Sequence, residues 1–168
     1  MRGVCSRNNV IIDNVCQNGV IDAFPWTGVP NSGLVDDPIA NNTVVNGWLR
    51  IGGSVPIINS NTRSINNLFV FDGSIASVSV CEGVEFSHNL WSTKPADAVM
   101  GTGSIIANPL ISQPDIDGLS NVRISDLTPL SRSPARGAGL DVKRMVPTDA
   151  LGRARGPHPS IGAIEIAP

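Results

Sequence analysis

One carboxylate and one imidazole, Glu85 and His88, lie three residues apart in the stretch 84–91. Both are side-chain types that transfer protons in general acid–base catalysis. His88, however, takes the place that an Asn has in two similar stretches, 39–44 and 64–69, which favours a polar ladder-capping residue over a catalytic base. No ionisable pair recurs at matching places on adjacent repeats. The sequence therefore predicts no complete catalytic centre, and Glu85 and His88 are its catalytic candidates.

Two short acidic turns are the candidate metal sites, one at Asp36 and Asp37 and the other at Asp115 and Asp117. Carboxylate oxygens are the ligands that Ca²⁺ prefers. Such turns are more commonly satisfied by their own backbone N–H groups. No CxxC or Cys/His pattern typical of zinc is present. We therefore expect no obligatory cofactor, with Ca²⁺ as the ion that either turn could hold.

Aromatic side chains offer a different chemistry, stacking on sugar rings. Phe24 and Trp26 belong to the Pro- and Gly-rich segment 24–38, which is typical of a protruding loop. Loops on a rigid scaffold commonly carry ligand contacts. A Trp that tethers the loop to the protein is an equally good interpretation of Trp26. Arg50 is the third candidate carbohydrate contact.

The C-terminal part carries a group of arginines, which are Arg132, Arg136, Arg144, Arg153 and Arg155. The simpler interpretation is a set of surface charges and caps. The alternative is a patch for anionic glycans.

Composition excludes several classes of protein. The chain has 168 residues, of which 15% are charged, and a net charge of −2, so one domain is expected and nucleic acid is not an expected partner. No run of about 20 apolar residues is present to span a membrane. The N-terminus lacks an apolar signal core. We expect a mature or trimmed part of a longer protein, in an extracellular or cell-surface setting.

The three cysteines cannot all pair with one another. Cys16 and Cys81 lie in apolar surroundings, which favours buried thiols. A disulfide between Cys5 and Cys16 is the alternative.

Four short stretches centred on an asparagine organise the chain. Their central residues, separated by 28, 25 and 22 positions, are Asn14, Asn42, Asn67 and Asn89. Two places after each comes an apolar residue, and these are Cys16, Val44, Phe69 and Trp91. Short strands that repeat at this interval are typical of a β-solenoid. Where the chain bends between sheets, a left-handed residue is often needed, and Asn tolerates that conformation well. We therefore expect these asparagines at left-handed corners, with their amides hydrogen-bonded as a ladder.

The remaining patterns agree with an all-β protein. No stretch shows sustained helical periodicity, whereas 75–80 alternates between apolar residues and others. Three sides per coil account for the strands and turns. We predict a single domain over 1–168, a three-sided parallel β-helix of about four coils, with Asn-centred coils at 9–94. The last strands and an irregular capping tail that closes the domain are expected at 95–168.

The tail carries a resemblance to a known family. Its segments, in order, are Asn108-Pro109-Leu110-Ile111, Ser133-Pro134-Ala135-Arg136-Gly137-Ala138-Gly139, Asp149-Ala150-Leu151-Gly152-Arg153 and Ile161-Gly162-Ala163-Ile164-Glu165. With the Asn-centred coils, they resemble the right-handed parallel β-helix, pectate-lyase-like superfamily and its C-terminal closure. Asn108 replaces the Asp of that pattern, and Ile164 replaces its aromatic residue. Both look like packing changes.

The resemblance implies polysaccharide or glycan as partner, since members cleave, epimerise or bind polysaccharides. We therefore expect a carbohydrate-interacting module without a complete catalytic centre. The alternative is a structural module that self-associates into a homo-oligomer through its open N-terminal coil. A polysaccharide lyase or hydrolase in its own right is the third hypothesis.

Overall fold

The computed structural model describes the backbone of residues 2–3, 6–7, 11–12, 15–17, 20–25, 33–52, 57–111 and 124–167. Side chains are described within these ranges from residue 33 onward, except at residue 125. Several predictions therefore lie outside the described residues, namely those made for Cys5, Asn14, Trp26, Asp115 and Asp117.

The described part is almost entirely β-structure. Its strands are β1 (Arg2–Gly3), β2 (Ser6–Arg7), β3 (Ile11–Ile12), β4 (Val15–Gln17), β5 (Val20–Pro25), β6 (Leu34–Val35), β7 (Pro38–Ala40), β8 (Thr43–Val45), β9 (Trp48–Ile51), β10 (Thr62–Ile65), β11 (Leu68–Val70), β12 (Ala76–Val78), β13 (Val84–Ser87), β14 (Leu90–Trp91) and β15 (Ile105–Ile106). Two short 3₁₀ helices, η1 (Asp97–Val99) and η2 (Ile124–Leu127), are the helical elements of that part. The absence of helical periodicity from the sequence agrees with this composition.

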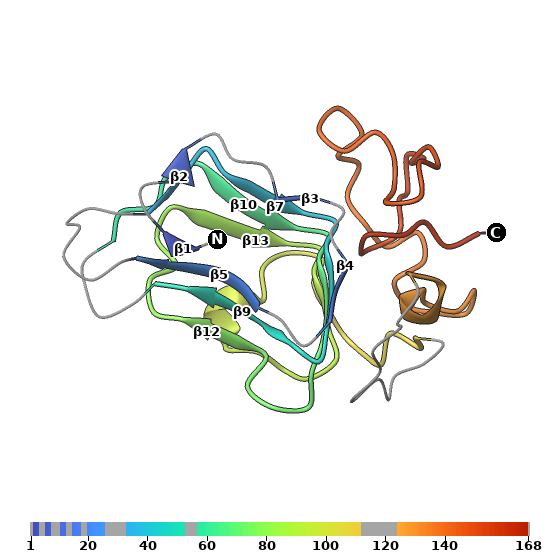
Figure 1. Cartoon of the computed structure of the whole chain (residues 1–168), viewed down its shortest axis with the longest axis horizontal. Coiled ribbons are helices and arrows are strands. Elements are labelled where there is room, and N and C mark those ends of the chain that lie inside the picture. The colour runs from blue at the N-terminus through green and yellow to red at the C-terminus, as the bar shows by residue number, and fades with distance from the viewer. Residues whose placement is uncertain are drawn as a thin grey trace.

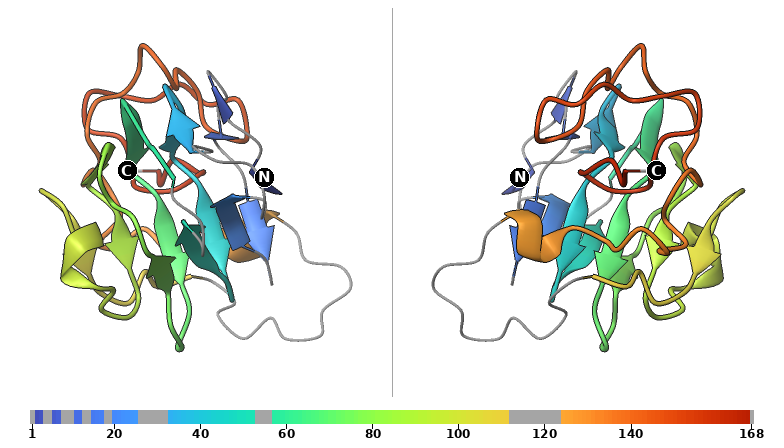
Figure 2. Two further views of the ribbon diagram at one scale, coloured as in Figure 1. Left: turned by 90° about the vertical axis from the view of Figure 1, so that its left-hand side faces the viewer. Right: turned by 90° about the vertical axis from the view of Figure 1, so that its right-hand side faces the viewer.

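From β7 to β14, successive strands join three parallel sheets in rotation. The sheets have the orders β1-β5-β9-β12, β13-β10-β7-β3 and β15-β14-β11-β8-β4, and a further pair joins β2 to β6. Figure 1 shows the first two sheets crossing the body, with the third standing at one side of them. In Figure 2, strands that are neighbours in these sheets, from successive passes of the chain, lie side by side.

The strand register reproduces the repeat intervals predicted from the sequence. Ile11 pairs with Ile39, Ile39 with Ser64, and Ser64 with Phe86. These pairs are 39 − 11 = 28, 64 − 39 = 25 and 86 − 64 = 22 residues apart. Because side chains alternate between the faces of a strand, this register keeps equivalent residues on one face.

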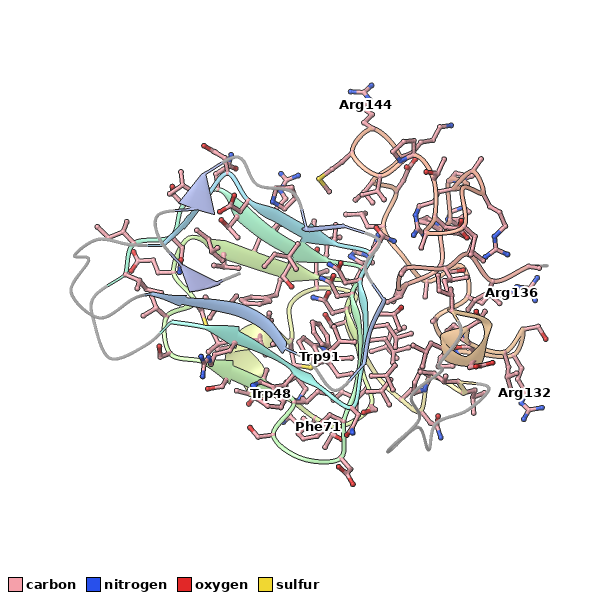
Figure 3. The ribbon with its side chains drawn as sticks, viewed as in Figure 1. Trp48, Phe71, Trp91, Arg132, Arg136 and Arg144 are labelled. Carbon is pink, nitrogen blue, oxygen red and sulfur yellow. The ribbon has the colours of Figure 1, made fainter. Side chains whose placement is uncertain are left out.

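The main core lies between the three sheets. Val44, Phe69 and Trp91, the apolar residues predicted to point inward, are all 0% exposed. The rings of Phe69 and Trp91 are stacked, with centroids 4.5 Å apart and planes 9° from parallel. The labelled Trp91 in Figure 3 accordingly points between the sheets.

The tail forms a second core against the outer face of the sheet β15-β14-β11-β8-β4. Val45, Leu68 and Leu90 on its strands are buried with Ala135 and Ile161 from the tail. Figure 1 shows the tail in orange and red beside this sheet, and the right-hand view of Figure 2 shows it in front of the strands. The tail packs along a side of this sheet, because the sheet has apolar residues on both faces.

At each asparagine corner, one residue takes the left-handed conformation and the next residue supplies the ladder amide. The prediction that the central asparagines are left-handed is wrong at the described corners. The left-handed residues are their predecessors Asn41, Asn66 and His88, with φ of 53°, 56° and 50°. The central residue of each pair instead turns its amide inward.

The inward amides form a hydrogen-bonded ladder. Asn42 donates from Nδ2 to Asn67 Oδ1 at 2.8 Å, and Asn67 donates from Nδ2 to Asn89 Oδ1 at 3.1 Å. The same oxygens accept the backbone N–H groups of Asn42 and Asn67, at 3.0 and 2.8 Å. All three side chains are 0% exposed. The ladder therefore satisfies buried backbone groups that the bend leaves without a strand partner.

Candidate functional site

The outward face of the sheet β1-β5-β9-β12 carries the best candidate site. Along β9, Leu49 and Ile51 are buried in the core, whereas Trp48 and Arg50 are half-buried on the opposite face. This alternation follows from the two-residue period of a strand. Ser77 of β12, which is exposed, stands in register with Arg50.

Trp48 forms an aromatic pair with Phe71, which follows β11 on the next pass of the chain. Their ring centroids are 5.7 Å apart and their planes are inclined by 34°. Figure 3 shows the two labelled rings together at one border of the sheets. Both rings are half-buried, so part of each aromatic surface faces solvent.

The backbone around Phe71 is held firmly. Its N–H donates to Ser92 Oγ at 2.9 Å, and its carbonyl accepts from Ser92 Oγ and Thr93 Oγ1 at 3.0 and 2.5 Å. A Cβ on Gly73 would come within 2.7 Å of the Phe71 ring, so the glycine leaves the ring its space. A ring fixed in this way loses little conformational entropy when a ligand binds.

The structure places only part of the predicted carbohydrate set. Arg50 is on the outward face of β9, as its place in an alternating strand requires. Phe24 lies in β5, the neighbouring strand, but its side chain is outside the described residues. Trp48 and Phe71 were missed by the sequence analysis. The two-residue alternation of side chains in a strand could have identified Trp48, since it lies two residues before Arg50 in the same strand.

Of the two catalytic candidates, Glu85 lies within β13 and His88 lies in the corner that follows β13. Glu85 pairs with Arg63 of β10, with Nε and Oε2 3.3 Å apart and both side chains more than half exposed. His88 occupies the left-handed corner next to Gly103, and its Nδ1 is buried without a hydrogen-bond partner. Within the described part of the chain, no hydrogen bond or ion pair joins Glu85 to His88. The arrangement provides no acid–base pair there.

The described acidic turn is held by hydrogen bonds from its own backbone and from the next pass of the chain. Asp36 accepts from Asn61 Nδ2 at 2.6 Å, and buried Asp37 accepts from the Val35 N–H at 3.2 Å. Among the described residues, no group of three or more His, Cys, Asp and Glu side chains could hold a metal ion. Ca²⁺ at Asp36 and Asp37 stays a prediction.

The tail arginines divide into two kinds. Arg132, Arg136 and Arg144 are exposed, and Figure 3 shows all three at the outer surface of the tail. Arg155 is only 3% exposed, so of the two roles expected for the tail arginines it is a cap of the closing segment and not a surface charge. Its Nη1 lies 2.6 Å from Glu165 Oε1, and its Nη2 donates to the carbonyls of Gly162 and Ala163.

Asp149 organises the neighbouring turn. Burial alone would raise the pKa of this carboxyl group. Hydrogen bonds from the backbone N–H groups of Glu165, Arg153 and Leu151, with the Arg153 guanidinium, outweigh burial and hold the pKa of Asp149 below its ordinary value. These contacts tie the final segment of the chain to the turn at 149–153. The cluster therefore stabilises the fold of the tail.

Cys81 is a free thiol with intermediate exposure, partly packed against the main core. Burial raises the pKa of this thiol, which disfavours the nucleophilic thiolate. The side chain of Cys16 lies outside the described residues.

Comparisons with known proteins give one informative similarity. No family model matches the chain. The chain is similar to outer membrane protein B of Rickettsia japonica (strain ATCC VR-1363 / YH), with 29% identity over 115 residues, 64% of this chain. The matched stretch spans only 6% of that relative's length. Neither 3₁₀ helix of the described part has the length or the hydropathy of a membrane-spanning segment.

Proposed function

We propose that the chain is a segment of a right-handed parallel β-helix of the pectate-lyase-like kind. Three observations support this fold: strands that join three parallel sheets in rotation, registers of 28, 25 and 22 residues, and a buried asparagine ladder. The right hand is expected because about 98% of parallel crossover connections have it.

We further propose that this segment binds carbohydrate without a catalytic centre of its own. The observation that carries the proposal is the half-buried Trp48–Phe71 pair on an outward sheet face, with Arg50 two residues beyond Trp48. Aromatic faces cover the apolar C–H faces of sugar rings, while guanidinium N–H groups donate to their hydroxyl oxygens. Binding is favoured over catalysis because Glu85 pairs with Arg63 and, among the described residues, makes no hydrogen bond or ion pair with His88.

A cell-surface setting belongs to the same proposal. The name of the similar protein, outer membrane protein B, supports that location. The small share of the relative that is covered favours a segment that works within a longer surface structure.

A glycan array, followed by titration of Trp fluorescence, tests the carbohydrate proposal. We expect the Trp48→Ala variant to lose at least tenfold in affinity for any glycan bound, while Trp48→Phe retains most of it. Leu151→Ala is the matched control, because Leu151 is an exposed apolar residue of the tail. Equal binding by Trp48→Ala and the original chain would contradict the assignment to this face.

The second candidate function is assembly. Among the described strands, β3 and β4 are the outermost of their sheets on one side. Unpaired strand edges are a template for pairing with another chain. Light scattering over a range of concentrations would detect such assembly. A discrete dimer or filament, with no glycan bound in the array, would favour this function over carbohydrate binding.

A further inference from the structure

A groove of about 490 Å³ lies between the tail loop 140–145 and the outward face of β10. Arg63 and Ile65 of β10 form one wall, and the loop forms the other. This groove is on a different sheet from Trp48, so it is independent of the proposed carbohydrate face.

Hydrogen bonds fix the loop wall in place. The Leu140 N–H donates to Asn66 Oδ1 at 2.8 Å, and Asn66 Nδ2 donates back to the Leu140 carbonyl at 2.9 Å. At the other end, the Val142 carbonyl accepts from the N–H groups of Met145 and Val146, both at 2.8 Å, and Val146 is 0% exposed. The loop is therefore a preformed wall anchored to a left-handed corner.

The rim of the groove is cationic. Arg63, Lys143 and Arg144 are exposed there, against Asp141 and the Glu85 carboxylate that pairs with Arg63. Asp141 Oδ1 accepts a hydrogen bond from the backbone N–H of Lys143 at 3.0 Å. Within the described residues, no ion pair engages Lys143 or Arg144. Since the whole chain has a net charge of −2, this rim is a local excess of positive charge on an acidic protein.

The floor of the groove is aliphatic. Val142 and Met145 are half-buried and supply its accessible aliphatic surface, whereas Ile65, which faces outward on β10, is only 1% exposed. No aromatic side chain is among the lining residues, which disfavours stacking on a sugar ring. Methionine and branched aliphatic side chains adapt to an inserted aliphatic group. The floor therefore suits a Leu or Ile side chain.

A ligand cannot bind in this groove by adding a strand to the sheet. β10 is an internal strand, paired with β7 on one side and β13 on the other, so its backbone groups are already used. A ligand in this groove must be recognised by side chains. Guanidinium groups favour carboxylates, which they bind with two parallel hydrogen bonds.

We propose that this groove docks an acidic polypeptide segment of a partner protein, with one aliphatic side chain on the floor and Asp or Glu residues against Arg63, Lys143 and Arg144. Glu85 competes for Arg63 in the free protein, through the ion pair at 3.3 Å. Removing that carboxylate should therefore strengthen binding, which a purely structural role for these residues does not predict.

NMR titration of the ¹⁵N-labelled chain with the peptide acetyl-Glu-Asp-Ile-Leu-Asp-Glu-amide tests the proposal. We expect saturable shifts of the Lys143 and Arg144 amide signals. Affinity should fall at least fivefold in the variant with Lys143→Gln and Arg144→Gln, and rise at least twofold in Glu85→Gln. These side chains are exposed, so unchanged urea midpoints should show that the variants remain folded.

Four controls decide the outcome. A peptide with Ala for Ile and Leu, and one with Lys for Asp and Glu, should each bind at least fivefold more weakly. Equal binding of the Ala peptide, or of an oligouronate, would overturn the proposal in favour of a general anion surface. Trp48→Ala should leave peptide binding unchanged, so failure of the carbohydrate proposal and failure of this one are separable.

Discussion

Asn67→Ala is the most informative perturbation, because this side chain is the centre of the buried ladder. Asn67 Oδ1 accepts from the backbone N–H of Asn42 at 3.0 Å, and its Nδ2 donates to the Ile39 carbonyl at 2.8 Å. Alanine removes the partner of both backbone groups and leaves no path for water, since the site is 0% exposed.

The expected cost follows from these two groups. A buried polar group left without its partner costs about 1–3 kcal/mol, so two groups give about 2–6 kcal/mol of lost unfolding free energy. Urea denaturation followed by circular dichroism measures this difference from the midpoint and the slope.

Asn61→Gly is the matched control. Asn61 is also an asparagine with positive φ, 48°, but it lies outside the ladder, and its hydrogen bond to Asp36 is exposed to solvent. Glycine accepts that conformation without strain, so a change within about 0.5 kcal/mol is expected. A loss below about 1 kcal/mol for Asn67→Ala would refute the reasoning that the ladder satisfies buried backbone groups.

Three further predictions concern the core and the tail. Phe69→Ala should cost about 3–5 kcal/mol in the same assay, because it empties a fully buried site stacked on Trp91, and a near-neutral result would contradict that packing. Asp149→Asn should destabilise the protein at pH 7. Because the folded pKa of Asp149 is lowered, its contribution is present above the ordinary aspartate pKa of about 3.9 and is lost as pH falls through the folded value, so the difference in urea midpoint should shrink there. A difference independent of pH would argue against this linkage. Arg155→Met should cost about 3–5 kcal/mol by leaving Glu165 without its buried partner, and Glu165→Gln in the Arg155→Met background should recover part of the loss in thermal unfolding; no recovery would contradict the pairing.

Local sequence patterns predicted the strands and their register. Short apolar runs with a period of two, bounded by Asn and Gly, encode each strand without reference to distant residues. Equivalent positions then align because only one register buries Val44, Phe69 and Trp91 together. Both the repeat intervals and the inward positions of these residues could therefore be predicted from the sequence.

The corner residues show where local reasoning failed. Asn41 and Asn42 have the same side chain, so composition cannot say which is left-handed. The choice depends on partners far away in the chain: Asn41 Nδ2 donates to the carbonyls of Ser160 and Gly162, while Asn42 turns to Asn67. The side-chain amide of Asn41 therefore bonds to the tail, and that of Asn42 bonds to the next pass of the chain.

The sequence by itself determined an all-β protein with parallel strands repeated at shortening intervals, because periodicity and turn residues act over a few positions. Only the tertiary structure decided that the tail lies along a side face, that Trp48 meets Phe71, and that Arg63 and Arg144 line one groove. Each of these joins segments from different passes of the chain, and their approach depends on which apolar faces remain to be buried. No pattern within one segment carries that information.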